Sequence, residues 1–151
     1  MSSPSNPPFE CLWRPSGLLL AFYLAVQACA LTAILLSGAP PAVRLVCLLL
    51  CLTHAWFALP RHILLSDPNA LRGLRHDGQG WHLWSERHGW QAVQLLPDSL
   101  ALPLVVVLRF RLPGRRLASS VCVPCDALPH EQHRRLRLCL KFSRRRWAAP
   151  E

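Results

Sequence analysis

The sequence predicts an α+β membrane protein with an N-terminal two-helix transmembrane hairpin, a small antiparallel β-sheet or partial barrel of about five strands, and a C-terminal amphipathic helix. Three observations predict this fold. Two long apolar runs occupy the first half of the chain, short segments divided by turn residues follow them, and a basic amphipathic segment comes last. With 151 residues, the chain has room for one small domain and an attached segment.

The composition combines hydrophobicity with charge of one sign. Hydrophobic residues make up 52% of the chain, and charged residues make up 17%, against roughly 25% in ordinary soluble domains. Lys and Arg number 17 against 8 acids, which gives a net charge of +9. The cysteine count of 7 is odd, and Cys29, Cys47 and Cys51 lie in apolar runs, so we expect free thiols and no disulfide framework. These features exclude a disordered chain and a large multidomain enzyme.

The first apolar run, residues 17–37, has no charged residue. As a helix it would be about 31 Å long, which is the thickness of a bilayer's hydrocarbon core. A cleaved signal peptide has a shorter apolar segment, and Pro40 and Pro41 after the run disfavour cleavage there. We therefore expect a membrane span.

The second apolar run, residues 42–60, is interrupted only by Arg44, which can snorkel outward because it lies near the start of the run. The connection of about four residues requires the two helices to run antiparallel. Residues 17–60 are thus predicted to form a hairpin, which puts the tail 1–16 and all residues after 60 on one side of the membrane.

Basic residues near the span ends predict the orientation. The short connection has Arg44 alone, whereas the other side is more basic, so the positive-inside rule places both termini in the cytoplasm. Trp13 at the end of the first span suits the interfacial aromatic belt. The residues that we expect at the membrane surface are Trp13, Arg14, Arg61, Arg72 and Arg75.

Small residues at every fourth position predict the face along which the two spans pack. They are Ala21, Ala25, Cys29 and Ala33 in the first span, and Cys47, Cys51, His54 and Ala58 form the corresponding face of the second. Gln27 and His54 are the strongly polar side chains at depth, and we expect them to serve the structure rather than a proton or metal relay.

After a linker at 61–69, residues 70–146 are predicted to form a basic cytoplasmic β module, followed by a tail at 147–151. Turn residues divide its first part into segments at 70–76, 81–85, 90–96, 102–112 and 115–123. The fourth segment shows the clearest alternation, with Leu108 and Phe110 on one face and Arg109 and Arg111 on the other.

A helix is predicted to open at residues 126–129, with Glu131 in its first turn. Its apolar side comprises Leu128, Leu136, Cys139 and Leu140, flanked by Leu138 and Phe142. Its polar side comprises His130, His133, Arg134, Arg137, Lys141, Arg144 and Arg145. This basic face has three open interpretations: it is merely solvated, it lies against acidic lipid headgroups, or it receives an acidic protein partner.

The sequence gives little support for enzymatic chemistry, a cofactor or a metal. Cys122 and Cys125 have the spacing of a metal or redox half-site, but the nearby His130 and His133 belong to a basic helix face that would repel a dication. There is no glycine-rich phosphate loop, G-x-S-x-G or H-E-x-x-H motif.

Nucleic-acid binding is the other function that the charge suggests, since Trp81, Trp84 and Trp90 could offer stacking platforms. Tryptophans beside hairpin turns of a small domain belong more often to its core or rim, and a tethered domain is poorly placed to search DNA. We expect a non-enzymatic protein that binds no nucleic acid.

The order of elements and motifs resembles the bacterial inner-membrane family called YgfX or CptA. The resemblance rests on W-x-L-W…G-W-x-x-V-x-L-L-P-x-S-L at 81–100, L-V-V-V-L-R-F-R at 104–111 and D-A-L…H-R-R-L-R-L-C-L at 126–140. It implies a membrane-anchored toxin-like component of a toxin–antitoxin pair, located in the inner membrane.

The resemblance also implies partners. Members interfere with tubulin-like and actin-like cytoskeletal polymers, and hence with cell shape and division, and are encoded beside a small antitoxin of the flavinylation-factor type. The matching residues that we regard as candidate partner contacts are Trp90, Arg134, Arg135, Arg137 and Lys141. An alternative function is a membrane-tethered assembly factor or lipid-sensing β module without toxin activity.

Overall fold

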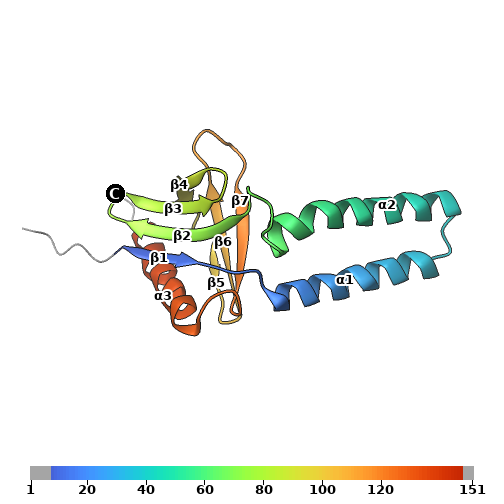
Figure 1. Ribbon diagram of the computed structural model, residues 1–151, viewed down its shortest axis with the longest axis horizontal. Helices are drawn as coiled ribbons and strands as arrows, with labels where there is room; N and C mark the ends of the chain where they lie inside the picture. Colours follow the sequence, from blue (N-terminus) through green and yellow to red (C-terminus); the bar gives the residue numbers. More distant parts are fainter. Residues whose placement is uncertain (1–7, 148–151) are drawn as a thin grey trace, which may run out of the picture.

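The computed structural model describes residues 8–147. Helices α1 (Gly17–Leu36) and α2 (Pro41–Ala58) form a hairpin that extends away from a β module (Figure 1). A short π-helix, η1 (Leu59–Ile63), continues α2. Among the described residues, two helices are long and apolar enough to cross a membrane, Gly17–Leu36 and the continuous Pro41–Ile63. The predicted helical hairpin is therefore present, and many of its large apolar side chains are exposed.

The β module is an antiparallel sheet that curls into a half-barrel (Figure 1). Within residues 8–147 its strands are β1 (Phe9–Leu12), β2 (Leu71–Asp77), β3 (Gly80–Ser85), β4 (Gly89–Leu95), β5 (Leu100–Ala101), β6 (Val105–Arg111) and β7 (Ser119–Pro124). Strands β1 to β4 pair in chain order, and β6 pairs with β4, β5 and β7. Helix α3 (His130–Trp147) completes the chain. The predicted combination of hairpin, curled sheet and terminal helix is confirmed.

The core of the module lies between the half-barrel and α3. Alternate residues of β6 supply part of it, because successive side chains of a strand point to opposite faces. Val106, Leu108 and Phe110 are buried, whereas Arg109 and Arg111 are exposed, as the alternation predicts. Leu136 of α3 belongs to the same buried cluster.

Strand β1 lies within residues 1–16, which the sequence predicts to be an N-terminal tail. Phe9–Leu12 pairs with β2 in the register Phe9 to His76 and Leu12 to Gly73. The strand has four residues, which is too short to show a period-two pattern. Its pairing depends on β2, a strand nearly sixty residues later in the chain, and no local sequence signal records that contact.

The prediction that Trp13 lies in the interfacial belt is wrong. Its side chain is only 4% exposed and belongs to the core of the β module. The indole Nε1 donates a hydrogen bond of 2.9 Å to the carbonyl oxygen of Leu71, and the backbone N–H of Trp13 donates one of 2.8 Å to that of Arg72. Because β1 leads directly into Trp13, strand pairing with β2 draws the indole into the module before α1 begins.

Asp126, just before α3, joins the first helix to the module. Its Oδ1 accepts a hydrogen bond of 2.5 Å from the Ser16 hydroxyl, and its Oδ2 accepts one of 3.1 Å from the backbone N–H of Leu18. Ser16 also caps α1, because its Oγ accepts from the N–H of Leu19 at 3.0 Å. Desolvation opposes ionisation of Asp126, but these hydrogen bonds outweigh it and lower its pKa. The start of α1 is thus fixed to the module.

The packing face predicted for α1 is also wrong. The small residues of that face, Ala21, Ala25, Cys29 and Ala33, are exposed. The helices meet instead through a 3.0 Å hydrogen bond between Tyr23 Oη and His54 Nδ1 and through a 3.2 Å bond from Gln27 Nε2 to the carbonyl oxygen of Cys51. Polar groups in hydrocarbon must find partners in the protein, and this requirement fixes the rotation of α1.

Candidate functional site

Helix α3 packs on the half-barrel through one face. His133, Leu136 and Leu140 are buried there, at spacings of three, four and seven residues that place them on one side of a helix. Leu128, just before the helix, is buried in the same cluster. The prediction of Leu128, Leu136 and Leu140 as core residues is confirmed.

The prediction that His133 and Arg137 lie on the polar face of α3 is wrong. His133 is 3% exposed, and Arg137 is half-buried with its Nε buried and without a hydrogen-bond partner among the described residues. Both lie at helical spacing with Leu136 and Leu140, so the packed face includes them despite their polarity. His133 finds a hydrogen bond with the backbone of Val123 in β7, which a polarity pattern cannot reveal.

The opposite side of α3 combines basic and apolar groups. Arg134, Leu138, Lys141 and Phe142 share this side, which we call the α3 outer face. Leu138 is 43% exposed and Phe142 is 61% exposed, while both basic residues are exposed. Arg135 is exposed at its margin. The side chains of Arg144 and Arg145 lie outside the described part of the chain, as does the tail after residue 147.

Burial of His133 makes the stability of the module sensitive to acid. Desolvation, followed by the charges of Arg137 and His130, lowers its pKa despite the Val123 hydrogen bond. The unfolded chain therefore binds the proton more readily, so this stabilisation is complete above about pH 6.5 and is lost as the pH falls through the folded-state value. We expect His133→Gln to reduce the fall in thermal midpoint between neutral and mildly acidic pH.

The measurement is thermal unfolding of the detergent-solubilised protein over that pH range. His88→Gln, which changes an exposed histidine in the β3–β4 turn, is the matched control and should leave the acid sensitivity unchanged. Equal slopes in the wild type and His133→Gln would show that His133 does not cause the sensitivity.

Trp90 lies on β4 directly opposite Trp84 of β3. Both are half-buried, and they lie over Gly73 of β2, where an added Cβ would lie 3.2 Å from Trp84 Cβ and 3.4 Å from Trp90 Cη2. Leu12 of β1 contacts the same position. Trp81, by contrast, is buried in the core. Trp90 therefore belongs to an apolar cluster separate from the basic residues of α3.

The basic residues predicted at the membrane surface have different surroundings. Arg14 is exposed, and its backbone N–H is bonded to the carbonyl oxygen of Ala127 at 2.9 Å. Arg72 donates to the carbonyl oxygen of Leu65 and lies 3.8 Å from a Glu86 carboxylate oxygen. Arg75 lies 3.5 Å from a carboxylate oxygen of Asp77. Arg72 and Arg75 are thus engaged within the module.

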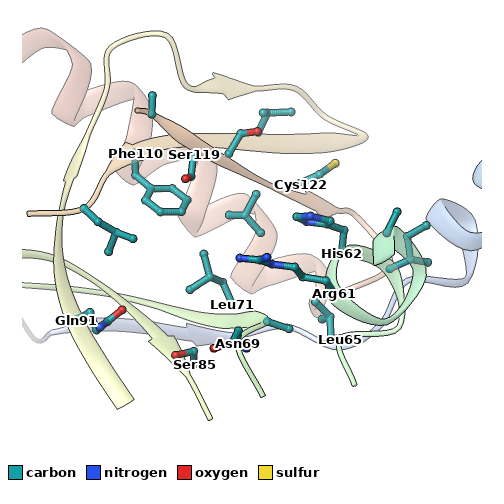
Figure 2. A pocket seen from close by; sticks show the side chains of 18 of the residues that line it. Arg61, His62, Leu65, Asn69, Leu71, Ser85, Gln91, Phe110, Ser119 and Cys122 are labelled. Carbon is teal, nitrogen blue, oxygen red and sulfur yellow. The ribbon is translucent and has the colours of Figure 1, made fainter. Parts of the chain in front are cut away.

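Arg61 instead extends into a large cavity, which we call the junction pocket (Figure 2). This cavity of about 1030 Å³ lies between the half-barrel and the base of the hairpin. Figure 2 shows Arg61 and His62 reaching from η1 toward walls formed by Leu71 and Phe110. Sequence reasoning identified Arg61 only as a surface charge, because the walls come from segments far apart in the chain.

The cysteines of the Cys122–Cys125 pair are free, as are the other five of the seven. Burial raises the pKa of the Cys122 thiol, which favours its protonated form. Within residues 8–147, no group of three or more His, Cys, Asp or Glu side chains is placed to hold a metal ion.

A hairpin with two candidate spans, fixed to a basic half-barrel, defines a membrane-anchored module. Residues 7–144 match the family described as the membrane-bound toxin component of a toxin–antitoxin system. This chain belongs to that family, the CptA toxin family. No curated protein and no solved structure matches it. Family membership establishes a membrane-bound toxin with an antitoxin partner, and it supports the toxin interpretation over the assembly-factor alternative.

Proposed function

We propose that this toxin acts without catalysis, by binding acidic protein partners on the cytoplasmic side of the inner membrane through the α3 outer face. The hairpin holds the module at the membrane, and the excess of basic residues beside the span ends supports a cytoplasmic location for both termini. Tethering raises the local concentration of the module, so a modest affinity for a membrane-associated target is sufficient.

The observation that carries the proposal is the mixed chemistry of the α3 outer face. Leu138 and Phe142 expose apolar surface, and Arg134 and Lys141 lie beside them on the same side of the helix. Protein interfaces join an apolar centre to a polar rim, and basic rims steer acidic partners into contact. Figure 1 shows α3 extending to the end of the module remote from the hairpin. In our proposal a cytoplasmic partner reaches the α3 outer face there.

The resemblance to the family supports the choice of partners. The targets are tubulin-like and actin-like cytoskeletal polymers, whose capture at the membrane would disturb cell shape and division. The small flavinylation-factor-like antitoxin would then relieve toxicity by occupying this face or by withdrawing the toxin from its target.

The direct test is sedimentation of purified tubulin-like polymer with proteoliposomes that contain the full chain. We expect the double variant Arg134→Glu/Lys141→Glu to lower the apparent affinity at least about tenfold, because like charges now meet across the interface. The same variant should lose growth arrest on controlled expression.

Arg116→Glu is the matched control, since Arg116 is exposed in the β6–β7 loop, and Figure 1 shows this loop far from α3. It should retain polymer binding and toxicity, and all variants should remain in the membrane fraction. Undiminished polymer capture by Arg134→Glu/Lys141→Glu would contradict the proposed face. A C-terminal reporter that is active only in the periplasm would contradict the proposed orientation.

A further inference from the structure

We propose that the junction pocket binds the anionic headgroup of a membrane phospholipid, with Arg61 and His62 contacting its phosphate. This site is distinct from the α3 outer face. It gives the toxin a specific lipid ligand in addition to its apolar anchor.

The position of the pocket is the first argument. Leu19 and Tyr23 of α1 and His54 and Ala58 of α2 line one side of it, so the cavity begins on the spans themselves. The ends of membrane-spanning helices lie at the headgroup layer. A lipid whose chains lie along the hairpin would therefore have its phosphate at the level of the pocket, whichever leaflet the module faces.

Charge is the second argument. The pocket is lined by two arginines, Arg61 and Arg115, and three histidines, His54, His62 and His88, and by no Asp or Glu among its described lining residues. Arg109, Arg72 and Arg75 each have a carboxylate within 4.0 Å, whereas Arg61 has none among residues 8–147. The hydrogen bonds of Asp67 with Asn69 lower the pKa of its carboxyl, and Asp67 is near enough for the charge of Arg61 to help lower it. With no carboxylate within 4.0 Å among the described residues, the Arg61 guanidinium is nevertheless suited to bidentate binding of phosphate.

The shape of the pocket is the third argument. Its volume of about 1030 Å³ is at the upper end of small-molecule sites, which leaves room for a headgroup, a glycerol unit and the start of an acyl chain. Leu71 and Phe110 supply apolar walls, while Gln91 and Ser119 add polar groups (Figure 2). This mixture matches the amphipathic junction of a phospholipid better than it matches a free inorganic ion.

The backbone after α2 holds the two phosphate-binding side chains in place. Pro60 lies in the π-helix η1, where the N–H of Leu64 donates to the carbonyl oxygen of Leu59 at 2.8 Å. Leu65 then adopts a left-handed conformation with φ of 52°, and its carbonyl oxygen accepts from Arg72. The turn that presents Arg61 and His62 is therefore fixed to β2 of the module.

The test is native mass spectrometry of the full chain in detergent, titrated with phosphatidylglycerol or with phosphatidylcholine. We expect preferential binding of phosphatidylglycerol and a loss of about fivefold in its affinity in Arg61→Gln, the effect of one positive charge near an anionic lipid. His62→Gln should also weaken the complex with phosphatidylglycerol. Arg61→Lys should retain most of the affinity because it keeps the positive charge.

Arg87→Gln is the matched control, because Arg87 is exposed in the β3–β4 turn and does not line the pocket. Equal affinity for both lipids, or an unchanged affinity in Arg61→Gln with a wild-type thermal midpoint, would overturn the proposal. Displacement of phosphatidylglycerol by millimolar inorganic phosphate would identify a free-anion site instead.

Protein binding is tested separately with the same variants. If Arg61→Gln abolished capture of the antitoxin while leaving the affinity for phosphatidylglycerol intact, the pocket would be a protein site and the lipid proposal would be wrong. Arg134→Glu/Lys141→Glu should keep its affinity for phosphatidylglycerol, so failure of the lipid site and failure of the α3 outer face give different results.

Discussion

Replacing Trp13 with alanine is expected to lower the free energy of unfolding of the β module by about 3–5 kcal/mol, the usual cost of removing a buried aromatic side chain. The indole is enclosed by the core and donates its N–H to the carbonyl oxygen of Leu71. Alanine would leave a cavity and an unsatisfied acceptor at the point where β1 passes into α1. The loss therefore also loosens the hairpin from the module.

The measurement is the thermal midpoint of the module in detergent, with tryptophan fluorescence as the probe of unfolding. We expect Trp13→Ala to lower this midpoint by more than about 10 °C. Trp56→Ala is the matched control, because Trp56 is 80% exposed on α2 and should contribute nothing to the packing of the module. Equal effects of the two substitutions would contradict the assignment of Trp13 to the core. Limited proteolysis between α1 and β2 should be faster in Trp13→Ala alone.

The parts of the fold that the sequence predicts well are those with a strong local period. Strand β6 is an example, since its alternation of apolar residues with Arg109 and Arg111 records which face is buried. The two candidate spans are predicted equally well, because the length and apolarity of the two runs suffice to identify them. Strand β1 is different, since four residues contain no complete pattern and their partner is distant in the chain.

Polar residues on packed faces explain the errors at the candidate site. The sequence assigns His133 and Arg137 to the basic face of α3 because their side chains are polar. Which residues of a helix are buried depends instead on their position around its axis. The interface of the hairpin is a second case. Tyr23 and Gln27 occupy it in preference to the small residues, because each finds a hydrogen-bond partner on α2. At the hairpin the polar groups between the helices are hydrogen-bonded, whereas on α3 His133 is buried and Arg137 half-buried because they lie at helical spacing with Leu136 and Leu140.

The junction pocket could not be predicted from the sequence at all. Its lining brings together η1, β2 and β7, segments separated by as many as sixty residues, and no local motif marks it. In the sequence, Arg61 and His62 look like ordinary flanking residues of a membrane span. In the structure, strands of the half-barrel surround them (Figure 2). Local sequence patterns thus predict the individual helices and strands, whereas this pocket depends on the tertiary arrangement of those elements.

Two leucines of α3 separate the structural role of the helix from its binding role. Leu136 is fully buried at 0% exposure, so Leu136→Ala is expected to cost about 2–5 kcal/mol of stability. Leu138 lies on the α3 outer face, so Leu138→Ala should change stability by no more than about 0.5 kcal/mol. The second substitution should nevertheless weaken polymer capture, because it removes apolar surface from the centre of the proposed interface.

Thermal unfolding and polymer sedimentation on the same two proteins measure both effects. The expected pattern is a lowered midpoint with Leu136→Ala and a lowered affinity at an unchanged midpoint with Leu138→Ala. If Leu138→Ala were as destabilising as Leu136→Ala, the face of α3 that contacts the half-barrel would be misassigned. If it bound polymer like the wild type at an unchanged midpoint, the basic residues alone would carry recognition, since electrostatic steering does not need an apolar centre.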